Sequence, residues 1–204
     1  ISQYGADTVR LFIMFAAPPE QSLEWSDSAV GGSHKFLKKL WKLAYQHNSA
    51  GVAAKLDAQS LSTEQQNLRR KTHETIAKVS DDYGRRLTFN TAIAAVMELC
   101  NEISRLNDRS DQGLAVEREA LETAVLLLAP IVPHISHSLW YALGHSKPII
   151  DSAWPEVDET ALVRSSIELV IQINGKVRGK MEVAADADEE HVLALALAQE
   201  NVQK

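Results

Sequence analysis

The chain has 204 residues, a formal net charge of −6 and 45% hydrophobic residues. These values are typical of a soluble globular protein with one domain, or with one large and one small domain. No window approaches the roughly 18 apolar residues of a membrane span, and no secretory signal is visible. The single Cys100 excludes an internal disulfide and a multi-cysteine metal site, as expected for a protein of the reducing cytoplasm.

Apolar residues at helical spacing predict a series of helices in the first 150 residues. Ser62 and Gln65 have the spacing of a capping box, which predicts a helix from there to about Gly84. Pro133 predicts the start of a short helix that ends before Gly144. Because no strand signal interrupts the series, we expect an antiparallel helical bundle. Further helices are predicted over 6–17, 27–48, 88–107 and from about 114 to Pro130.

The periodicity then changes from 3.6 to 2. Ile167, Leu169 and Ile171 alternate with other residues as in a half-buried strand, and Asn174-Gly175 signals a hairpin. A helix in "DEEHVLALALAQENVQK" follows. The sequence therefore predicts a mainly α chain with a helical bundle over 1–153, a linker over 154–164 and a partial α+β module over 165–204. Since there is no initiator Met and no stop signal after the last helix, we expect a truncated piece of a longer protein.

The hairpin register follows from where the cations must lie. A two-residue Asn-Gly turn would pair Ile171 with Arg178 and place charge on the apolar face. A three-residue loop over 174–176 pairs Ile173 with Val177 and keeps the apolar residues together. We therefore predict the longer loop.

That register points the hairpin cations to solvent, where they suit contact with a phosphate backbone. They equally suit a solvated strand that protects a sheet edge. The segment is not a nucleotide-binding P-loop, because the glycine spacing is one residue short and Met181 replaces the required Ser or Thr. The hairpin cations are Lys176, Arg178 and Lys180.

A second basic feature lies in "KFLKKLWKL", where four lysines follow the i, i+3, i+4, i+7 pattern of one helix face. Trp41 is assigned to the opposite, apolar side. Arg85 and Arg86 add further positive charge. Each of these features is also compatible with an ordinary solvated face. The four lysines are Lys35, Lys38, Lys39 and Lys42.

No catalytic or metal constellation is apparent. His134 and His137 are three residues apart, but no partner completes a metal site, and we assign them to capping or packing. Cys100 falls on an apolar helix face. The tryptophans are assigned to core or docking roles.

Several segments together resemble a known family. "YGADTVRLFIMFAAPPEQSLEW", "KFLKKLWKL", "RRLTFNTAIAAVMELCNEI" and "LLLAPIVPHISHSLWYALG" resemble the helical anticodon-binding-type domain of class I aminoacyl-tRNA synthetases. "VIQINGKVRGKMEV", followed by "DEEHVLALA", is similar to the start of the C-terminal domain of bacterial leucyl-tRNA synthetases.

The resemblance implies that the parent enzyme joins leucine to its tRNA with ATP and Mg²⁺, and that this portion holds the tRNA. The Lys-Met-Ser-Lys-Ser and His-Ile-Gly-His signatures are absent, so the catalytic and editing parts would lie upstream and this portion alone would be inactive. The family's C-terminal module contacts the tRNA elbow. This implies tRNA contact by the hairpin cations and by the four lysines of "KFLKKLWKL", with Arg85 and Arg86 as further candidates.

Three alternatives remain at the level of sequence. The chain is compatible with a free-standing RNA-binding protein, and with a helical scaffold that binds another protein through its tryptophan-bearing face. A corresponding fragment of a valyl or isoleucyl enzyme is the third alternative.

Overall fold

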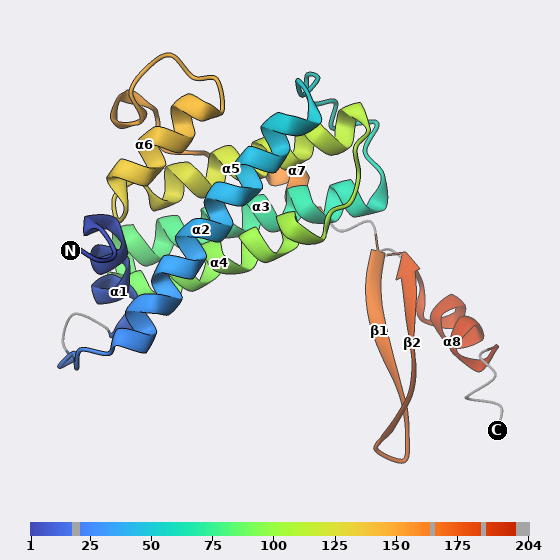
Figure 1. Cartoon of the computed structure of the whole chain (residues 1–204). Helices are drawn as coiled ribbons and strands as arrows, with labels where there is room; N and C mark the ends of the chain where they lie inside the picture. The colour runs from blue at the N-terminus through green and yellow to red at the C-terminus, as the bar shows by residue number, and fades with distance from the viewer. Residues whose placement is uncertain (18–20, 164–165, 185–186, 199–204) are drawn as a thin grey trace. The chain divides into compact units, whose positions relative to one another are not determined.

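The computed structural model describes residues 1–17, 21–163, 166–184 and 187–198. Contacts divide the chain into two compact units, Ile1–Ala161 and Leu162–Lys204. The first is a helical bundle, and the second contains a β-hairpin and a helix (Figure 1). This architecture confirms the predicted fold class. The predicted linker over 154–164 falls across the division between the units.

Local capping signals determine where several helices of the first unit begin. The Ser26, Ser62 and Ser110 side chains each accept a hydrogen bond from a backbone N–H three residues on. The predicted capping box is confirmed, because Gln65 Oε1 accepts from the Ser62 N–H at 2.8 Å. The helices are α1 (Ala6–Ala16), α2 (Asp27–Ala50), α3 (Thr63–Asp81), α4 (Phe89–Arg105), α5 (Asp111–Leu128), α6 (Pro133–Ala142) and α7 (Glu159–Leu162), with a 3₁₀ turn η2 (Ile149–Asp151).

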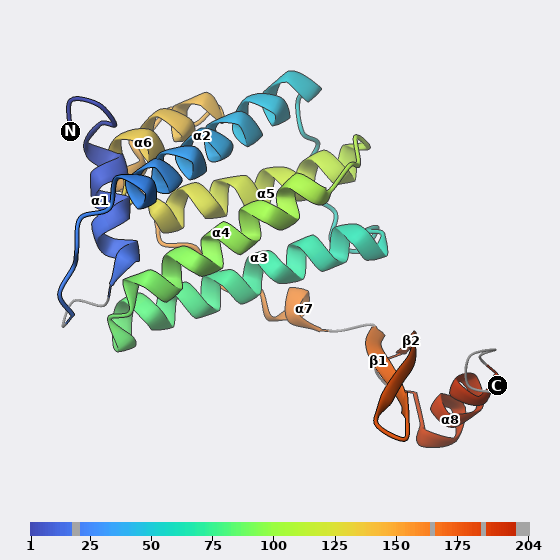
Figure 2. The ribbon, with the colours of Figure 1, turned by 60° about the horizontal axis from the view of Figure 1, so that its bottom comes forward.

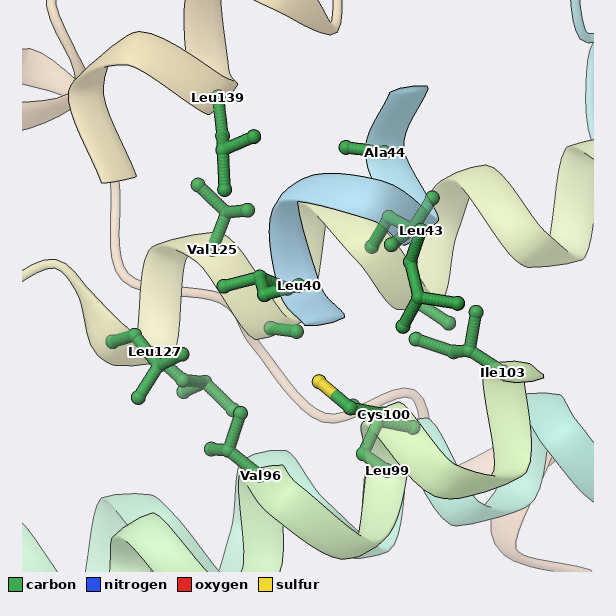
Figure 3. Close-up of a cluster of buried hydrophobic side chains, with 14 of the residues drawn as sticks. Leu40, Leu43, Ala44, Val96, Leu99, Cys100, Ile103, Val125, Leu127 and Leu139 are labelled. Carbon is green, nitrogen blue, oxygen red and sulfur yellow. The ribbon is translucent and has the colours of Figure 1, made fainter. Parts of the chain in front are cut away.

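The core of this unit is organised around α5, which contacts α2, α3, α4 and α6 (Figures 1 and 2). Leucines, isoleucines and valines from these helices meet in one apolar cluster (Figure 3). Each fully buried leucine stabilises the fold by about 2 kcal/mol relative to an exposed one. Cys100 lies within this cluster as predicted, and burial raises the pKa of its thiol to about 12. The thiol is therefore an inert packing group.

A π-helical turn, η1 (Asp82–Arg86), joins α3 to α4. Leu87 follows it with φ 54°, in the left-handed region that residues other than glycine rarely adopt. Burial raises the pKa of Asp82, but the hydrogen bonds it accepts outweigh this effect and hold the pKa below its ordinary value. The buried carboxylate thus fixes an unusual corner. Its donors are Lys78, Arg86, Thr88 and Thr91.

Within its described residues, the second unit contains two antiparallel strands and one helix after the end of α7. Strand β1 (Ser166–Ile173) pairs with β2 (Lys176–Ala184), and α8 (Glu189–Leu197) follows. The end of the predicted last helix, residues 199–204, lies outside the described residues.

Candidate nucleic-acid interface

The turn of the hairpin differs from the prediction. Ile173 pairs with Lys176, so Asn174 and Gly175 alone form the loop. Their φ values of 52° and 76° are those that a type I′ turn requires, and Asn-Gly is the dipeptide that adopts it most readily. The predicted three-residue loop over 174–176 is therefore wrong.

A β-bulge explains how the tight turn avoids burying charge. Gln172 pairs with Val177 and Ile171 with Gly179, so Arg178 is an extra residue on β2. The bulge shifts the register by one residue. It thereby gives the predicted pairing of Ile171 with Gly179, although the loop is one residue shorter than predicted.

The bulge also changes the exposed face of the hairpin. Val177 was predicted on the apolar face but is 61% exposed. Its partner Gln172 lies on the opposite face of β1 from the half-buried Leu169. Lys180 pairs with Val170, which is 48% exposed. The strand pair thus presents positive charge to solvent. The three hairpin cations, Lys176, Arg178 and Lys180, are all exposed.

One long face of α2 carries four lysines, called the α2 lysines below: Lys35, Lys38, Lys39 and Lys42. Leu37 and Leu40 are buried in the core, and this fixes the opposite side of α2 toward solvent. Lys39 is half-buried and donates a 2.6 Å hydrogen bond to Asn101 Oδ1 on α4. An α2 surface suited to phosphate therefore remains, formed by the exposed Lys35, Lys38 and Lys42.

A hollow of about 510 Å³ adjoins Lys38, between the start of α1, α2 and α6. Lys38 and Trp41 line it together with His34 and His134. Trp41 is 47% exposed, so its assignment to the apolar side of α2 is wrong. Helical spacing alone misplaced it because it lies at the edge of the buried stripe.

Arg85 and Arg86 lie on η1 with their charges balanced by aspartates. Arg85 donates to both Asp81 oxygens, at 2.6 and 2.8 Å, and this pairing raises the pKa of its guanidinium. Arg86 Nη1 lies 3.2 Å from Asp82 Oδ1. These arginines consequently offer less uncompensated charge to an anion than the exposed α2 lysines do.

The histidines of "PHISH" have packing partners. His134 Nδ1 lies 2.9 Å from Asp7 Oδ1, and the His137 ring meets that of Tyr141 edge-on. Among the residues that the structure describes, no group of three His, Cys, Asp or Glu side chains is arranged to hold a metal ion. No helix in the same set is long and apolar enough to cross a membrane.

The fold and the matching family model identify the class of protein. A model described as the anticodon-binding domain of tRNA ligase matches residues 65–193. The chain therefore belongs to the anticodon-binding domain family of tRNA ligases.

Relatives narrow this assignment. The leucine–tRNA ligase of Chromohalobacter salexigens is 64% identical over 204 residues, and that of Cellvibrio japonicus is 66% identical over 205 residues. The two alignments cover all of this chain but only 24% of each relative. The chain therefore spans about a quarter of the length of these curated relatives. They confirm the resemblance to bacterial leucyl-tRNA synthetases.

A solved structure shares the fold over nearly the whole chain. It is the crystal structure of the ternary complex of Agrobacterium radiobacter K84 agnB2 LeuRS with tRNA and LeuAMS. The TM-score is 0.81 at 28% identity, and the match covers 98% of this chain and 26% of that chain.

Proposed function

We propose that this chain is the tRNA-holding portion of a leucine–tRNA ligase. The observation that carries the proposal is the match over 98% of the chain to a LeuRS that was crystallised with tRNA. The identity of 58–66% to leucine–tRNA ligases favours leucine over the valyl and isoleucyl alternatives.

The chain's own residues contribute charge and shape. The α2 lysines and the hairpin cations project from a helix and a strand pair, so they meet the phosphate backbone without first being ordered. Such contacts recognise the form of the tRNA rather than its base sequence. In this proposal the hairpin contacts the tRNA elbow, and "anticodon-binding" describes the fold. Holding the tRNA in place lowers the entropic cost of the reaction.

The chemistry is assigned to the upstream catalytic domain of the same polypeptide. That domain would use ATP and Mg²⁺ to activate leucine, in the cytoplasm. ATP does not fit the glycine-containing segment 173–180, because the segment forms a hairpin rather than a loop between a strand and a helix. The present portion alone is expected to form no leucyl-adenylate.

Fluorescence anisotropy of labelled leucine tRNA, titrated with the whole chain, tests this function. If about six cations contact phosphates, affinity should fall on the order of a thousandfold between about 50 and 200 mM salt. A tRNA of different shape should compete less well than unlabelled leucine tRNA.

Each alternative predicts another result. A free-standing RNA-binding protein would show the salt dependence without a preference for leucine tRNA. A protein-binding scaffold would show no salt-sensitive affinity for RNA, and this outcome would contradict the proposal.

A further inference from the structure

A group of charged and polar side chains fastens the segment before the second unit to the bundle. Arg69 on α3 is buried, with Nε 3.2 Å from Glu119 Oε2 and Nη2 2.5 Å from Asp158 Oδ2. His73 Nδ1 accepts a hydrogen bond from the Asp158 backbone N–H at 3.1 Å, while its Nε2 lies 3.3 Å from Glu119 Oε1. We call these four residues the clamp. They join three segments that lie far apart in the sequence.

Asp158 also organises the backbone that follows it. Its Oδ1 accepts hydrogen bonds from the Thr160 N–H and hydroxyl, at 2.9 and 2.6 Å. The Thr160 hydroxyl and the Arg69 guanidinium hold the pKa of Asp158 well below its ordinary value. The carboxylate is therefore ionised at neutral pH, and the clamp is closed.

A weaker anchor precedes the clamp. Trp154 Nε1 donates to Ser80 Oγ at 2.8 Å, and the indole meets the Tyr83 ring with centroids 5.8 Å apart. Trp154 is 40% exposed. Without the clamp, Trp154 would be the last hydrogen-bonded anchor before the second unit begins at Leu162.

We propose that the clamp sets the length of the tether between the α2 lysines and the hairpin cations, and so the strength with which they bind one tRNA together. This inference rests on the proposed function. Arg69, His73, Glu119 and Asp158 are positioning residues in it, since they act through the second unit.

The expected size of the effect follows from the tether. Strand β1 begins at Ser166, eight positions after Asp158 and twelve positions after Trp154. Opening the clamp therefore frees up to four more residues and lengthens the tether by about half, or by at most about 14 Å of extended chain. Because effective concentration falls roughly as the −3/2 power of linker length, binding of tRNA should weaken about twofold.

The test compares Asp158→Asn with Glu98→Gln in the whole chain. Both variants remove one negative charge and break one ion pair with a cation on α3. The Lys71–Glu98 pair, however, holds no part of the segment 154–160. Asparagine can still cap Thr160, so folding is preserved. We expect about twofold weaker binding of leucine tRNA for Asp158→Asn and no loss for Glu98→Gln, measured by anisotropy. A second variant, Asp158→Ala, should lose at least as much.

A double-mutant cycle separates positioning from stability. The twofold loss should disappear when the hairpin cations are already replaced by alanine, since the tether then joins the bundle to nothing that binds. An equal loss in both backgrounds, or equal affinities of Asp158→Asn and Glu98→Gln, would overturn the clamp proposal while leaving the proposed function intact. If the unmodified chain binds no tRNA, the proposed function itself fails and the clamp proposal fails with it.

Discussion

Replacing Lys176, Arg178 and Lys180 together by alanine is expected to weaken leucine tRNA binding about a hundredfold at about 0.1 M salt. Each phosphate contact contributes roughly 0.7 to 0.9 to the slope of log affinity against log salt, so this slope should become shallower by about 2 to 3. The three side chains are exposed, and their removal leaves the bundle folded. Anisotropy titrations at several salt concentrations measure the slope directly.

A matched control removes the same charge from three cations of the bundle. Arg70, Lys71 and Arg105 are paired with glutamates at 3.7, 2.8 and 2.6 Å. Replacing these three by alanine should change affinity much less and leave the slope nearly unaltered. If the control and the hairpin variant lose affinity equally, net charge rather than the hairpin governs binding.

Asp82→Ala should lower the free energy of unfolding of the bundle by about 3 kcal/mol. Asp82 is fully buried and accepts from two cations and two hydroxyls, so its loss removes a connected network at once. Thr88 and Thr91 would then keep hydroxyls without their acceptor, and the η1 corner would lose its support. Urea unfolding followed by circular dichroism measures the change.

Two comparisons make the Asp82 result specific. Asp81→Ala removes the neighbouring exposed carboxylate and should change stability little. The pKa of Asp82 is lower in the folded than in the unfolded protein, so its contribution is fully present above the unfolded value and is lost as pH falls through the folded value. The stability difference between wild type and Asp82→Ala should therefore shrink below about pH 4. A difference that is constant with pH would contradict the ionic network.

The helices were predictable because their signals are local. The Ser62–Gln65 capping box and Pro133 each act within one turn, and the structure confirms both. The short elements η2 and α7 were not predicted, since three or four residues carry no periodicity.

The hairpin shows where pattern reasoning fails. Asn174-Gly175 correctly indicated a tight turn, but the alternation of apolar residues along the two strands predicted a longer loop. The extra residue Arg178 resolves that conflict, and a bulge is invisible to a rule that counts every second residue. Local turn chemistry was therefore the better guide at the tip, and periodicity was the better guide beyond the bulge.

The candidate interface could be predicted only in part, because some ion pairs form within one helical turn and others form between distant parts of the chain. Arg85 and its partner Asp81 are four residues apart, so their pairing was visible in the sequence. Arg69 and Asp158 are 89 residues apart, and only the folded chain brings them together. The sequence thus indicates which cations exist, while tertiary contacts decide which remain exposed for RNA.

We propose that two separate surfaces, on the bundle and on the hairpin, hold one tRNA. Hydroxyl-radical footprinting of leucine tRNA with the whole chain tests it most directly. We predict two separate protected regions. When the hairpin cations are replaced by alanine, the protection at the elbow should disappear and the other protected region should remain. A single protected region, or elbow protection that survives this replacement, would contradict binding of the tRNA by two surfaces.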